Sequence, residues 1–448
     1  MKKVITYGTY DLLHEGHINL LKRAKALGDY LIVGVTSDSY DKDRGKLNVR
    51  NNVLERVEAV KSTGLADEII IEDYIGQKID DIQKYDVDIF AIGSDWEGKF
   101  DYLKEYCEVI YLPRTEGISS TLLRNQTTEI INIGIIGCGR VAGRFPSEAI
   151  KVSGIAVECA YDINENQKQN FTRNTGIPTV DSLKDLYSKV QGVYIATPHL
   201  THYSLIKEAL ENGKHVLVET PMVLKGSEAK ELYDLAASNK LILMEANKTA
   251  HCPAFNHLMV MIKSGVIGEV VDIEASLSKL WDDDKTLREF DPAQAGGSMY
   301  ELGSYPLLPI LKLAGINYDK IEFYSRFKGG VDLYTKGIVT YPNKVCSFKV
   351  GLGVKTEGNL VISGTQGYAY VPSPWWKTDY FELRYEDQNK NKKFFYKWDG
   401  TGLRYEIQEF ISCILNNRLS SARLRRKESM KMAEVMEIFS KGRNTIMI

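Results

Sequence analysis

Short apolar runs alternate with helical patterns over residues 1 to 125, and the same alternation restarts at Ile131. In the first stretch the apolar runs are Val4 to Tyr7, Tyr30 to Val35, Glu68 to Ile71, Asp88 to Ile92 and Glu108 to Leu112. Alternation of this kind predicts strands that lie parallel in one sheet, with helices covering both of its faces. We therefore predict the α/β fold class.

The composition is that of an ordinary globular protein, with 448 residues of which 44% are apolar and 26% are charged. A chain of this length should form about two to four domains. The formal charge of -2 gives no electrostatic reason to expect nucleic acid or an anionic membrane as a partner. The six cysteines lack Cys-x-x-Cys spacing, which argues against a disulfide framework and a zinc site. No apolar run has the length of a signal or membrane segment, so we expect a cytoplasmic protein.

The stretch from Tyr7 to His17 contains residue types that packing alone does not explain. It follows an apolar run and precedes a helical pattern, so His14 and His17 should lie on a turn beside a helix N-terminus. At such a turn, unpaired backbone N–H groups and the helix dipole attract anions, and Gly8 and Gly16 let the backbone come close. Two imidazoles there can donate hydrogen bonds to phosphate oxygens. The alternative is a pair of helix-start histidines that bind no ligand.

This stretch resembles the nucleotidyltransferase signature of the cytidylyltransferases, and most closely that of the glycerol-3-phosphate cytidylyltransferases, which make CDP-glycerol for wall teichoic acids. The resemblance covers residues 1 to about 125 and includes the runs 93–101 (GSDWEGKFD) and 112–121 (LPRTEGISST). It implies transfer of a cytidylyl group from CTP to a polyol phosphate, with glycerol phosphate as the best single acceptor. Those enzymes usually carry an arginine after the second helix, where this chain has Gly64-Leu65-Ala66.

The resemblance and the chemistry of phosphoryl transfer assign roles to individual residues. A phosphate monoester is already an anionic nucleophile at neutral pH, so the reaction needs charge neutralisation rather than a general base. His14 and His17 would donate to the reacting phosphate. Mg²⁺ is expected with CTP, held mainly by the phosphates, with Asp11 as a protein contact. The predicted catalytic residues are His14, His17, Lys46 and Arg114, and the predicted nucleotide-binding residues are Gly8, Thr9, Asp11, Arg56, Asp95, Trp96, Thr115, Gly117 and Ser119. Lys46 lies in a charged run, residues 41–46, that is also typical of a solvated loop.

A short polar stretch, residues 122–130, separates the two alternations and has no Pro-rich or Gly-rich spacer. Two domains joined this closely cannot swing far apart. We predict a cytidylyltransferase domain over residues 1–127, a dinucleotide-binding domain over 131–250 and an α/β domain over 251–448, whose last helices pack back on the second domain.

The second alternation opens with a glycine motif, residues 137–142 (GCGRVA), directly after the apolar run Ile131 to Ile136. A lone motif of this type is weak evidence, but here a second apolar run follows and ends in Asp162, about 20 residues on, as a ribose-binding acid requires. In a dinucleotide-binding fold, Gly137 and Gly139 would let the backbone approach the pyrophosphate. Asp162 would accept from the adenosine ribose hydroxyls, and an acid at this place favours NAD over NADP.

Polar residues follow three later apolar runs, at the strand ends where such sheets bind their ligands. They are Thr197-Pro198-His199, Glu219-Thr220-Pro221 and Glu245-Ala246-Asn247-Lys248. The predicted cofactor-binding residues are Gly137, Gly139, Arg140, Ala142, Asp162, Thr197, Pro198, His202 and Glu219. For His202 the alternative is a plain helix-start histidine. From about residue 265 the period changes, since the runs between Val270 and Ser363 predict an open, largely antiparallel sheet. A helical period returns from about Arg404 to Lys441.

Residues 131 to 448 resemble the glucose-fructose oxidoreductase and inositol dehydrogenase family, which pairs a Rossmann domain with an α/β domain whose sheet often forms the dimer interface. The resemblance implies NAD(P)-dependent oxidoreduction and a homo-oligomer. Family members usually carry Glu-Lys-Pro and, later, Asp-x-Gly-x-His. This chain has Glu-Thr-Pro at 219–221 and Glu-Leu-Gly-Ser-Tyr at 301–305, so the lysine, the aspartate and the histidine are replaced. Hydride transfer to a carbonyl still needs a proton donor, for which Lys248 and Tyr305 are the candidates. The alternative for Lys248 is a surface lysine.

Three hypotheses for function follow. In the first, the C-terminal part reduces a keto- or aldo-phosphate to a polyol phosphate with NAD(P)H, and the N-terminal part converts that product to a CDP-polyol. In the second, the C-terminal part has lost its redox chemistry and serves as a nucleotide sensor or a dimerising scaffold, which the replaced lysine of Glu-Lys-Pro favours. In the third, the two parts serve unrelated pathways.

Overall fold

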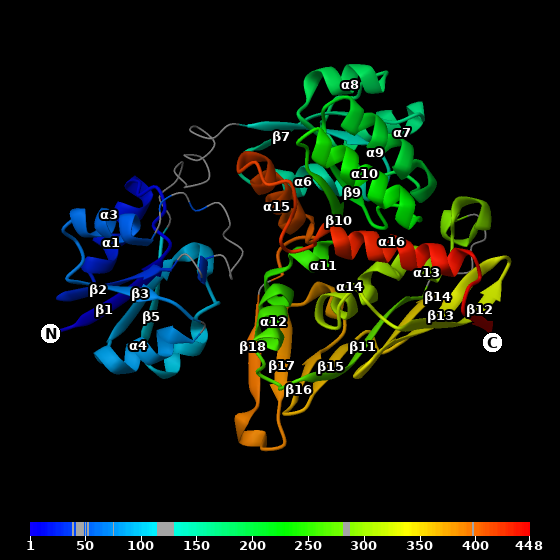
Figure 1. Ribbon diagram of the computed structural model, residues 1–448. Coiled ribbons are helices and arrows are strands. Elements are labelled where there is room, and N and C mark those ends of the chain that lie inside the picture. Colours follow the sequence, from blue (N-terminus) through cyan, green and yellow to red (C-terminus); the bar gives the residue numbers. More distant parts are fainter. Residues whose placement is uncertain are drawn as a thin grey trace. The chain divides into compact units, whose positions relative to one another are not determined.

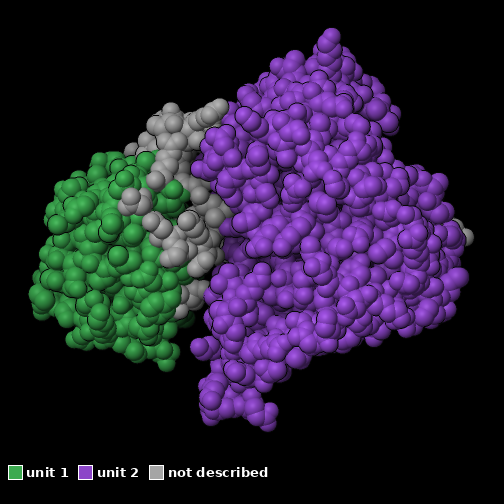
Figure 2. Space-filling view, viewed as in Figure 1, with its two compact units in different colours: residues 1–129 green, residues 130–448 purple. Residues whose placement is uncertain are grey.

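The computed structural model describes residues 1–37, 40–41, 49, 51, 53–74, 76–113, 130–280, 287–396 and 398–448. The chain forms two compact units, Met1–Glu129 (unit 1) and Ile130–Ile448 (unit 2), which Figure 2 shows in different colours. Nearly all of the stretch 122–130 that we expected to join two domains lies outside the described residues.

Unit 1 is built on a five-stranded parallel sheet in the order β3-β2-β1-β4-β5 (Figure 1). The strands are β1 (Lys3–Gly8), β2 (Tyr30–Thr36), β3 (Glu68–Glu72), β4 (Ile89–Gly93) and β5 (Glu108–Leu112). The helices are α1 (Glu15–Lys25), α3 (Val53–Ser62) and α4 (Gln77–Tyr85), with the 3-10 turns η1 (Ser94–Trp96) and η2 (Asp101–Glu105). Alternate strand residues face opposite sides, so Val4 packs with α1 and α3 while Ile5 packs with α4 and η2. The strand order reverses between β1 and β4, which places the turn after β1 at the point where such sheets bind ligands.

Unit 2 begins with a second five-stranded parallel sheet, in the order β10-β9-β8-β6-β7. Its strands are β6 (Ile131–Ile136), β7 (Ile155–Tyr161), β8 (Gly192–Ile195), β9 (His215–Glu219) and β10 (Leu243–Ala246). Its helices are η3 (Ala142–Arg144), α6 (Phe145–Ala149), α7 (Glu165–Thr175), α8 (Leu183–Lys189), η4 (His199–Thr201), α9 (His202–Glu211) and α10 (Gly226–Ser238). Helices α8, α9 and α10 cover one face, and α6 and α7 cover the other. A helix from the end of the chain, α15 (Leu403–Leu415), packs on that second face beside α6, because Ile407 and Phe410 join its apolar core.

A nine-stranded mixed sheet follows, in the order β18-β17-β16-β15-β11-β14-β13-β12-β19. Its strands are β11 (Val270–Lys279), β12 (Lys320–Lys328), β13 (Val331–Tyr341), β14 (Lys344–Leu352), β15 (Leu360–Gly364), β16 (Tyr368–Val371), β17 (Tyr380–Arg384), β18 (Lys392–Phe395) and β19 (Thr445–Met447). Helices α12 (Pro253–Lys263), α13 (Ser298–Leu302), α14 (Ser304–Leu313) and α16 (Arg426–Ser440) pack on one face of it (Figure 1). Shorter elements are α11 (Lys248–His251), η5 (Arg288–Phe290), η6 (Pro292–Gln294), η7 (Trp375–Lys377) and η8 (Gln388–Lys390).

The predicted α/β class is confirmed, and so is the open, largely antiparallel sheet in the last part of the chain. The sheet is largely antiparallel, but β11 pairs in parallel with β14 and β12 with β19. The helical period expected from Arg404 to Lys441 forms two helices, because the chain leaves α15 after Leu415 and Asn417 adopts a left-handed φ of 51°. Among the described helices, none has the length and apolar character needed to cross a bilayer.

Candidate active sites

The turn between β1 and α1 places the two predicted histidines side by side. His14 is the N-cap of α1, and its Nδ1 accepts a hydrogen bond from the backbone N–H of Gly16 at 3.1 Å. The rings of His14 and His17 stack, with centroids 3.9 Å apart and an interplanar angle of 20°. Tyr10 packs edge-on against His17 from beneath the turn, with ring centroids 5.5 Å apart. Because Nδ1 of His14 is an acceptor, the proton of its neutral ring lies on Nε2, which is therefore the donor nitrogen of the ring.

Arg56 lies inside unit 1 and fixes the backbone of the same turn. Its guanidinium donates to the carbonyl oxygens of Thr9 at 2.7 Å and Thr36 at 2.8 Å. It also pairs with Asp41 at 3.1 Å, and the Thr9 hydroxyl donates to the other oxygen of that carboxylate at 2.8 Å. Asp11 is buried as well, and it accepts from the backbone N–H of Asn51 at 3.0 Å. The structure thus gives Arg56 a role in holding the turn, while its predicted contact with phosphate stays a prediction.

The predicted cytidine and acceptor residues follow β4. Asp95 and Trp96 lie on η1, and the Trp96 ring is 39% exposed, with the ammonium of Lys99 4.8 Å from its centroid. Sequence reasoning did not single out Lys78 on α4, which is buried beside the end of β1. Its ammonium pairs with Glu72 and lies 4.5 Å from the centroid of the Tyr7 ring. Lys78 therefore adds a cation near the start of the histidine turn.

The remaining predicted residues of unit 1, Lys46, Arg114, Thr115, Gly117 and Ser119, lie outside the described residues. Within the described part, no group of three or more His, Cys, Asp or Glu side chains is arranged to hold a metal ion. Mg²⁺ held mainly by CTP, with Asp11 as its protein contact, stays a prediction.

The glycine motif of unit 2 forms a tight turn against the end of β8. Gly137 has a φ of +96°, and a Cβ there would lie 2.5 Å from the carbonyl oxygen of Ala196, so only glycine fits. No described atom lies within 4 Å of the place a Cβ would take on Gly139, so the turn is open on that side. Asp162, at the end of β7, accepts from the backbone N–H groups of Cys138 and Asn164, both at 2.8 Å. An open glycine turn with a carboxylate held beside it fits a dinucleotide.

A cavity of about 610 Å³ lies in unit 2 at the carboxyl ends of the parallel strands, and the second half of the unit closes it. It brings together Arg140, Thr197, Pro198 and Glu219 of the predicted cofactor site, and both predicted proton donors, Lys248 and Tyr305. Its other lining residues include Arg144, His199, Thr220, Lys279, Arg288, Glu289, Glu301, Trp376, Lys377 and Glu406. Ala142 is buried in η3, behind the glycine turn.

Lys248 and Tyr305 differ as proton donors. Burial lowers the pKa of the Lys248 ammonium, which makes it a stronger acid than an ordinary lysine, while the nearby Glu406 and Glu219 raise that pKa in part. Burial and the same carboxylates raise the pKa of the Tyr305 phenol well above its usual range. Thr220, which replaces the family lysine, donates its hydroxyl to Glu245 at 2.9 Å. Of the two predicted donors, Lys248 can therefore release a proton more readily.

Sequence reasoning missed Glu406, which reaches the cavity from the first turn of α15. Its side chain is 1% exposed, and neither carboxyl oxygen has a hydrogen-bond partner among the described residues. Burial raises the pKa of this carboxyl well above its usual range. No signal in the sequence could have found it, because a glutamate in a first helical turn is ordinary.

Two histidines flank the cavity in different ways. His199 lines it beside the ion pair of Arg288 and Glu301, whose closest atoms are 2.9 Å apart, and burial lowers the pKa of this imidazole to about 3. His202 is fully buried at the start of α9, where its ring nitrogens lie 3.0 Å from the carbonyl oxygen of Pro221 and 2.9 Å from that of Thr197. His202 thus joins two strand-end loops and is not among the described residues that line the cavity. Its role toward a cofactor stays a prediction.

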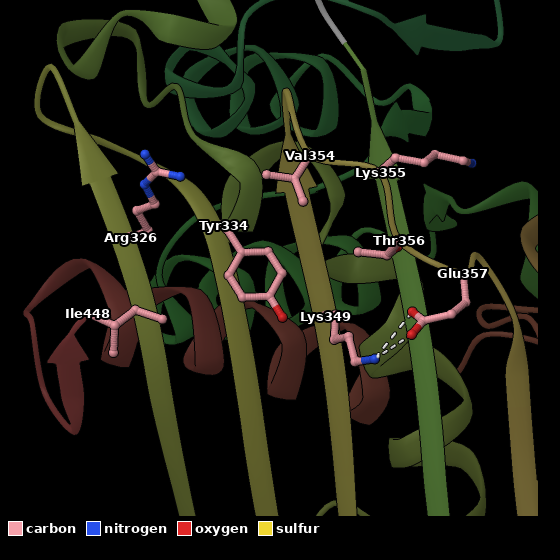
Figure 3. Close-up of a pocket in the computed structure, with 8 residues that line it drawn as sticks. All are labelled: Arg326, Tyr334, Lys349, Val354, Lys355, Thr356, Glu357 and Ile448. Atoms are coloured by element: carbon pink, nitrogen blue, oxygen red, sulfur yellow. Dashed lines mark hydrogen bonds and ion pairs between the residues drawn. The ribbon is translucent and has the colours of Figure 1, made fainter.

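A second hollow, of about 530 Å³, lies over the nine-stranded sheet (Figure 3). Arg326, Tyr334 and Lys349 project from neighbouring strands into it, and Lys349 pairs with Glu357 at 3.0 Å. None of the predicted site residues lines it.

Three family models match the chain. Residues 5–126 match the model described as cytidylyltransferase-like, residues 131–247 the oxidoreductase family with an NAD-binding Rossmann fold, and residues 255–370 the GFO/IDH/MocA C-terminal domain.

Curated relatives match each unit separately. The glycerol-3-phosphate cytidylyltransferase of Bacillus spizizenii is 53% identical over 130 residues, which are 29% of this chain and 100% of that protein. The corresponding enzyme of Staphylococcus aureus is 52% identical over 126 residues, or 28% of this chain and 95% of that protein. The trans-1,2-dihydrobenzene-1,2-diol dehydrogenase of Oryctolagus cuniculus is 29% identical over 317 residues, or 68% of this chain and 95% of that protein.

Solved structures share the fold of unit 2. A 3-ketoreductase from Actinomadura kijaniata, in complex with NADP and TDP-benzene, matches with a TM-score of 0.63 and 21% identity over 71% of this chain and 100% of that chain. A levoglucosan dehydrogenase, in complex with NADH and levoglucosan, matches with a TM-score of 0.64 and 17% identity over 70% of this chain and 97% of that chain. The chain therefore belongs to the glycerol-3-phosphate cytidylyltransferase family through unit 1 and carries, in unit 2, the Rossmann and C-terminal domains of the GFO/IDH/MocA oxidoreductase family.

Proposed function

We propose that this protein makes a CDP-polyol in two steps. Unit 2 reduces a keto- or aldo-phosphate to a polyol phosphate with NAD(P)H, and unit 1 then transfers a cytidylyl group from CTP to that product. Glycerol phosphate is the best-supported acceptor, because the cytidylyltransferases that match unit 1 over nearly their whole length are named for it. One chain that carries two consecutive activities raises the chance that the intermediate is used before it escapes.

The observation that carries the proposal for unit 1 is the stacked histidine pair at the N-terminus of α1. In the proposed reaction, a phosphate oxygen of the acceptor forms a bond to the α-phosphorus of CTP, the bond to the bridging oxygen breaks, and diphosphate leaves. His14 and His17 would donate to the phosphoryl oxygens on which charge develops. Mg²⁺ would neutralise charge on the phosphates when bound, and Asp11 would be its protein contact.

The observation that carries the proposal for unit 2 is that Lys248 lines the same cavity as the glycine turn and the strand ends. When bound, a reduced nicotinamide would supply the hydride. The glycine turn would hold the pyrophosphate, Asp162 would accept from the adenosine ribose, and this acid favours NAD over NADP. Lys248 would give a proton to the oxygen of the reduced carbonyl group, in place of the lysine that Thr220 replaces.

A second candidate is a cytidylyltransferase whose unit 2 binds a nucleotide without redox chemistry. The replacement of the family lysine by Thr220, whose hydroxyl is a poor proton source, favours it. A homo-oligomer is expected in both cases, because the resembled family often uses its open sheet as a dimer interface.

Both candidates are tested by one panel of substrates. Diphosphate release from CTP is measured with a series of polyol phosphates, and oxidation of NADH and of NADPH with the matching keto- and aldo-phosphates and their CDP-linked forms. The proposal predicts cytidylyl transfer to one polyol phosphate and reduction of its carbonyl counterpart. If only the CDP-linked carbonyl compound is reduced, cytidylyl transfer comes before reduction. If no compound is reduced while transfer proceeds, unit 2 is not a reductase.

A further inference from the structure

Two of the charged side chains in the cavity of unit 2, Lys248 and Glu406, come from segments more than 150 residues apart in the sequence. Lys248 begins the short helix α11 at the end of β10, and Glu406 lies in the first turn of α15. Both residues line the cavity.

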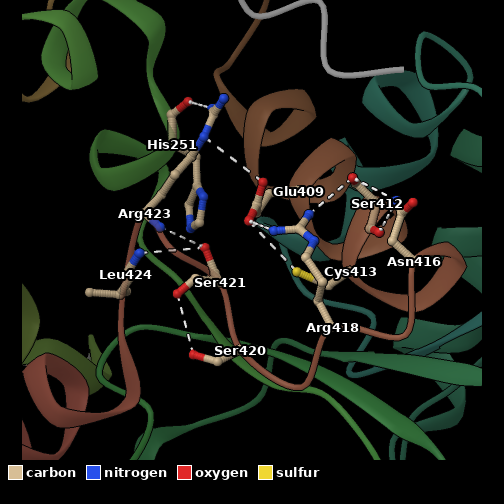
Figure 4. A network of polar contacts seen from close by, with 10 residues as sticks. All are labelled: His251, Glu409, Ser412, Cys413, Asn416, Arg418, Ser420, Ser421, Arg423 and Leu424. Carbon is tan, nitrogen blue, oxygen red and sulfur yellow. Dashed lines mark hydrogen bonds and ion pairs between the residues drawn. The ribbon is translucent and has the colours of Figure 1, made fainter. Parts of the chain in front are cut away.

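A network of hydrogen bonds and ion pairs connects α11 to α15 (Figure 4). Arg423 donates from Nη1 to the carbonyl oxygen of His251, the last residue of α11, at 2.9 Å. The same guanidinium lies 3.9 Å from the carboxylate of Glu409 on α15, which also pairs with Arg418 at 3.1 Å. The network therefore fixes the helix that carries Lys248 against the helix that carries Glu406.

Two of the carboxyls that line the cavity, Glu219 and Glu406, differ in their hydrogen bonds. Glu219 accepts a hydrogen bond from the hydroxyl of Tyr194, which stabilises its ionised form. Neither oxygen of Glu406 has a partner among the described residues, and its side chain is 1% exposed. An ionised carboxylate without hydrogen bonds is costly to bury, whereas a neutral carboxylic acid is far less so. Burial raises the pKa of both carboxyls, but the Tyr194 hydrogen bond lowers that of Glu219 in part, so Glu406 is the carboxyl that keeps its proton to the higher pH.

We propose that Glu406 and Lys248 form a proton-transfer pair, in which Lys248 gives a proton to the oxygen being reduced and the Glu406 carboxyl replaces it. Glu406 acts through Lys248 and does not need to touch the substrate. The inference rests on the proposed reduction for its chemistry, but the pairing of the two side chains can be tested without any substrate.

The proposed step balances as follows. The carbonyl carbon takes a hydride, with its electron pair, from the reduced nicotinamide of NAD(P)H, and the C=O π bond breaks toward oxygen. That oxygen takes a proton from the Lys248 ammonium and becomes a hydroxyl group. Neither Glu406 oxygen is within hydrogen-bond distance of Lys248, so the neutral Lys248 amine takes the proton of the Glu406 carboxyl through water in the cavity, and the carboxylate regains a proton from water. The sum is a carbonyl compound, NAD(P)H and one proton going to an alcohol and NAD(P)⁺.

Several titratable groups lie near Lys248 and Glu406 and influence how the protonation of these two side chains changes with pH. Those that act on Lys248 include Glu406, Glu219, Lys377, Arg144 and Lys279. Those that act on Glu406 include Glu219, Lys248, Glu148, Tyr305 and Tyr194. In the proposed pair, the Glu406 carboxyl gives up its proton first as the pH rises, because the Lys248 ammonium lowers its pKa. This carboxylate then keeps Lys248 protonated to a higher pH.

The test measures the protonation of Lys248 directly. The full-length protein is treated briefly with acetic anhydride over a range of pH, and acetylation of the peptide that contains Lys248 is quantified by mass spectrometry. In Glu406→Gln the midpoint of Lys248 labelling should move to lower pH, because no carboxylate can form beside the ammonium. Glu406→Asp should return the midpoint toward that of the parent. Glu289→Gln is the matched control, since Glu289 lines the same cavity but is not among the groups that act on Lys248.

The reductase assay gives the second readout. The alkaline limb of the kcat/KM profile for NAD(P)H oxidation should move to lower pH in Glu406→Gln, in step with the labelling midpoint, while cofactor binding stays unchanged. A labelling midpoint that does not move, in a variant with the parent's thermal stability, overturns the pair. If the parent protein reduces no carbonyl compound but the Lys248 labelling midpoint moves in Glu406→Gln, the coupling of the two side chains is supported and the proposed reduction is wrong.

Discussion

The guanidinium of Arg56 and the carboxylate of Asp41 form an ion pair in which neither side chain is more than 1% exposed. Replacing Arg56 by Met should leave the Asp41 carboxylate buried without the opposite charge of the guanidinium, and so lower the free energy of unfolding of unit 1 by about 3–5 kcal/mol. Hydrogen exchange of unit 1 peptides measures this change within the full-length protein. Lys61→Met is the control, because its partner Glu58 and Lys61 itself are 72% and 69% exposed and the pair should contribute little. Equal exchange in the two variants would show that the pair does not hold the turn.

His17→Ala should leave the fold intact and remove most CDP-polyol formation. Loss of one fixed donor to the developing charge should lower kcat by about 100- to 1,000-fold. Diphosphate release from CTP measures it, with circular dichroism as the check on folding. NAD(P)H oxidation by the same preparation is the internal control and should not change. If the variant is folded and has the turnover of the parent, His17 takes no part in the reaction.

Asp162→Ala should weaken the binding of NADH more than that of NADPH, because only NADH presents the free 2'-hydroxyl from which the carboxylate accepts. The same carboxylate accepts from the backbone N–H of Cys138, so both cofactors should lose some affinity as the glycine turn loosens. Titration of each cofactor by protein fluorescence gives the two dissociation constants. Tighter binding of NADPH than of NADH by the parent protein would contradict the preference.

Lys248→Met should abolish NAD(P)H oxidation by the right carbonyl substrate and leave cofactor binding and cytidylyl transfer in place. In the parent, burial lowers the pKa of this ammonium, so the rate of reduction should fall as the pH rises through a value below that of an ordinary lysine. A profile of kcat against pH measures this decrease. If the variant keeps its reductase rate, Lys248 is not the donor and Tyr305 becomes the better candidate.

The parallel sheets could be predicted because buried parallel strands are nearly continuous apolar runs. The bounds expected for β5 and β6 are those observed, Glu108–Leu112 and Ile131–Ile136. The strands β16, β17 and β18 were not predicted, since in residues 368–395 charged and aromatic residues alternate without a clear apolar face. Their pairing depends on neighbours in the sheet rather than on their own pattern.

The site residues also include some that the sequence could predict and some that it could not. Residues that follow apolar runs, such as Asp162, Glu219 and Lys248, could be predicted to meet at one sheet edge because parallel strands end together. Glu406 could not, because its place in the cavity depends on the packing of α15 against a sheet that ends about 160 residues earlier. The phosphate contact suggested for Arg56 stays a prediction, and the structure adds the hydrogen bond of its guanidinium to the Thr9 carbonyl oxygen, which no sequence pattern indicated.

The central claim is that one chain carries out both steps toward a CDP-polyol. The most direct measurement is mass spectrometry of the product after incubation of the full-length protein with CTP, Mg²⁺, NADH or NADPH, and the keto- or aldo-phosphates that correspond to glycerol phosphate. We expect a CDP-polyol that carries a deuteron from 4-deuterated NAD(P)H, lost in both His17→Ala and Lys248→Met. A CDP-polyol that forms from the polyol phosphate but never from any carbonyl phosphate with NAD(P)H would contradict the claim.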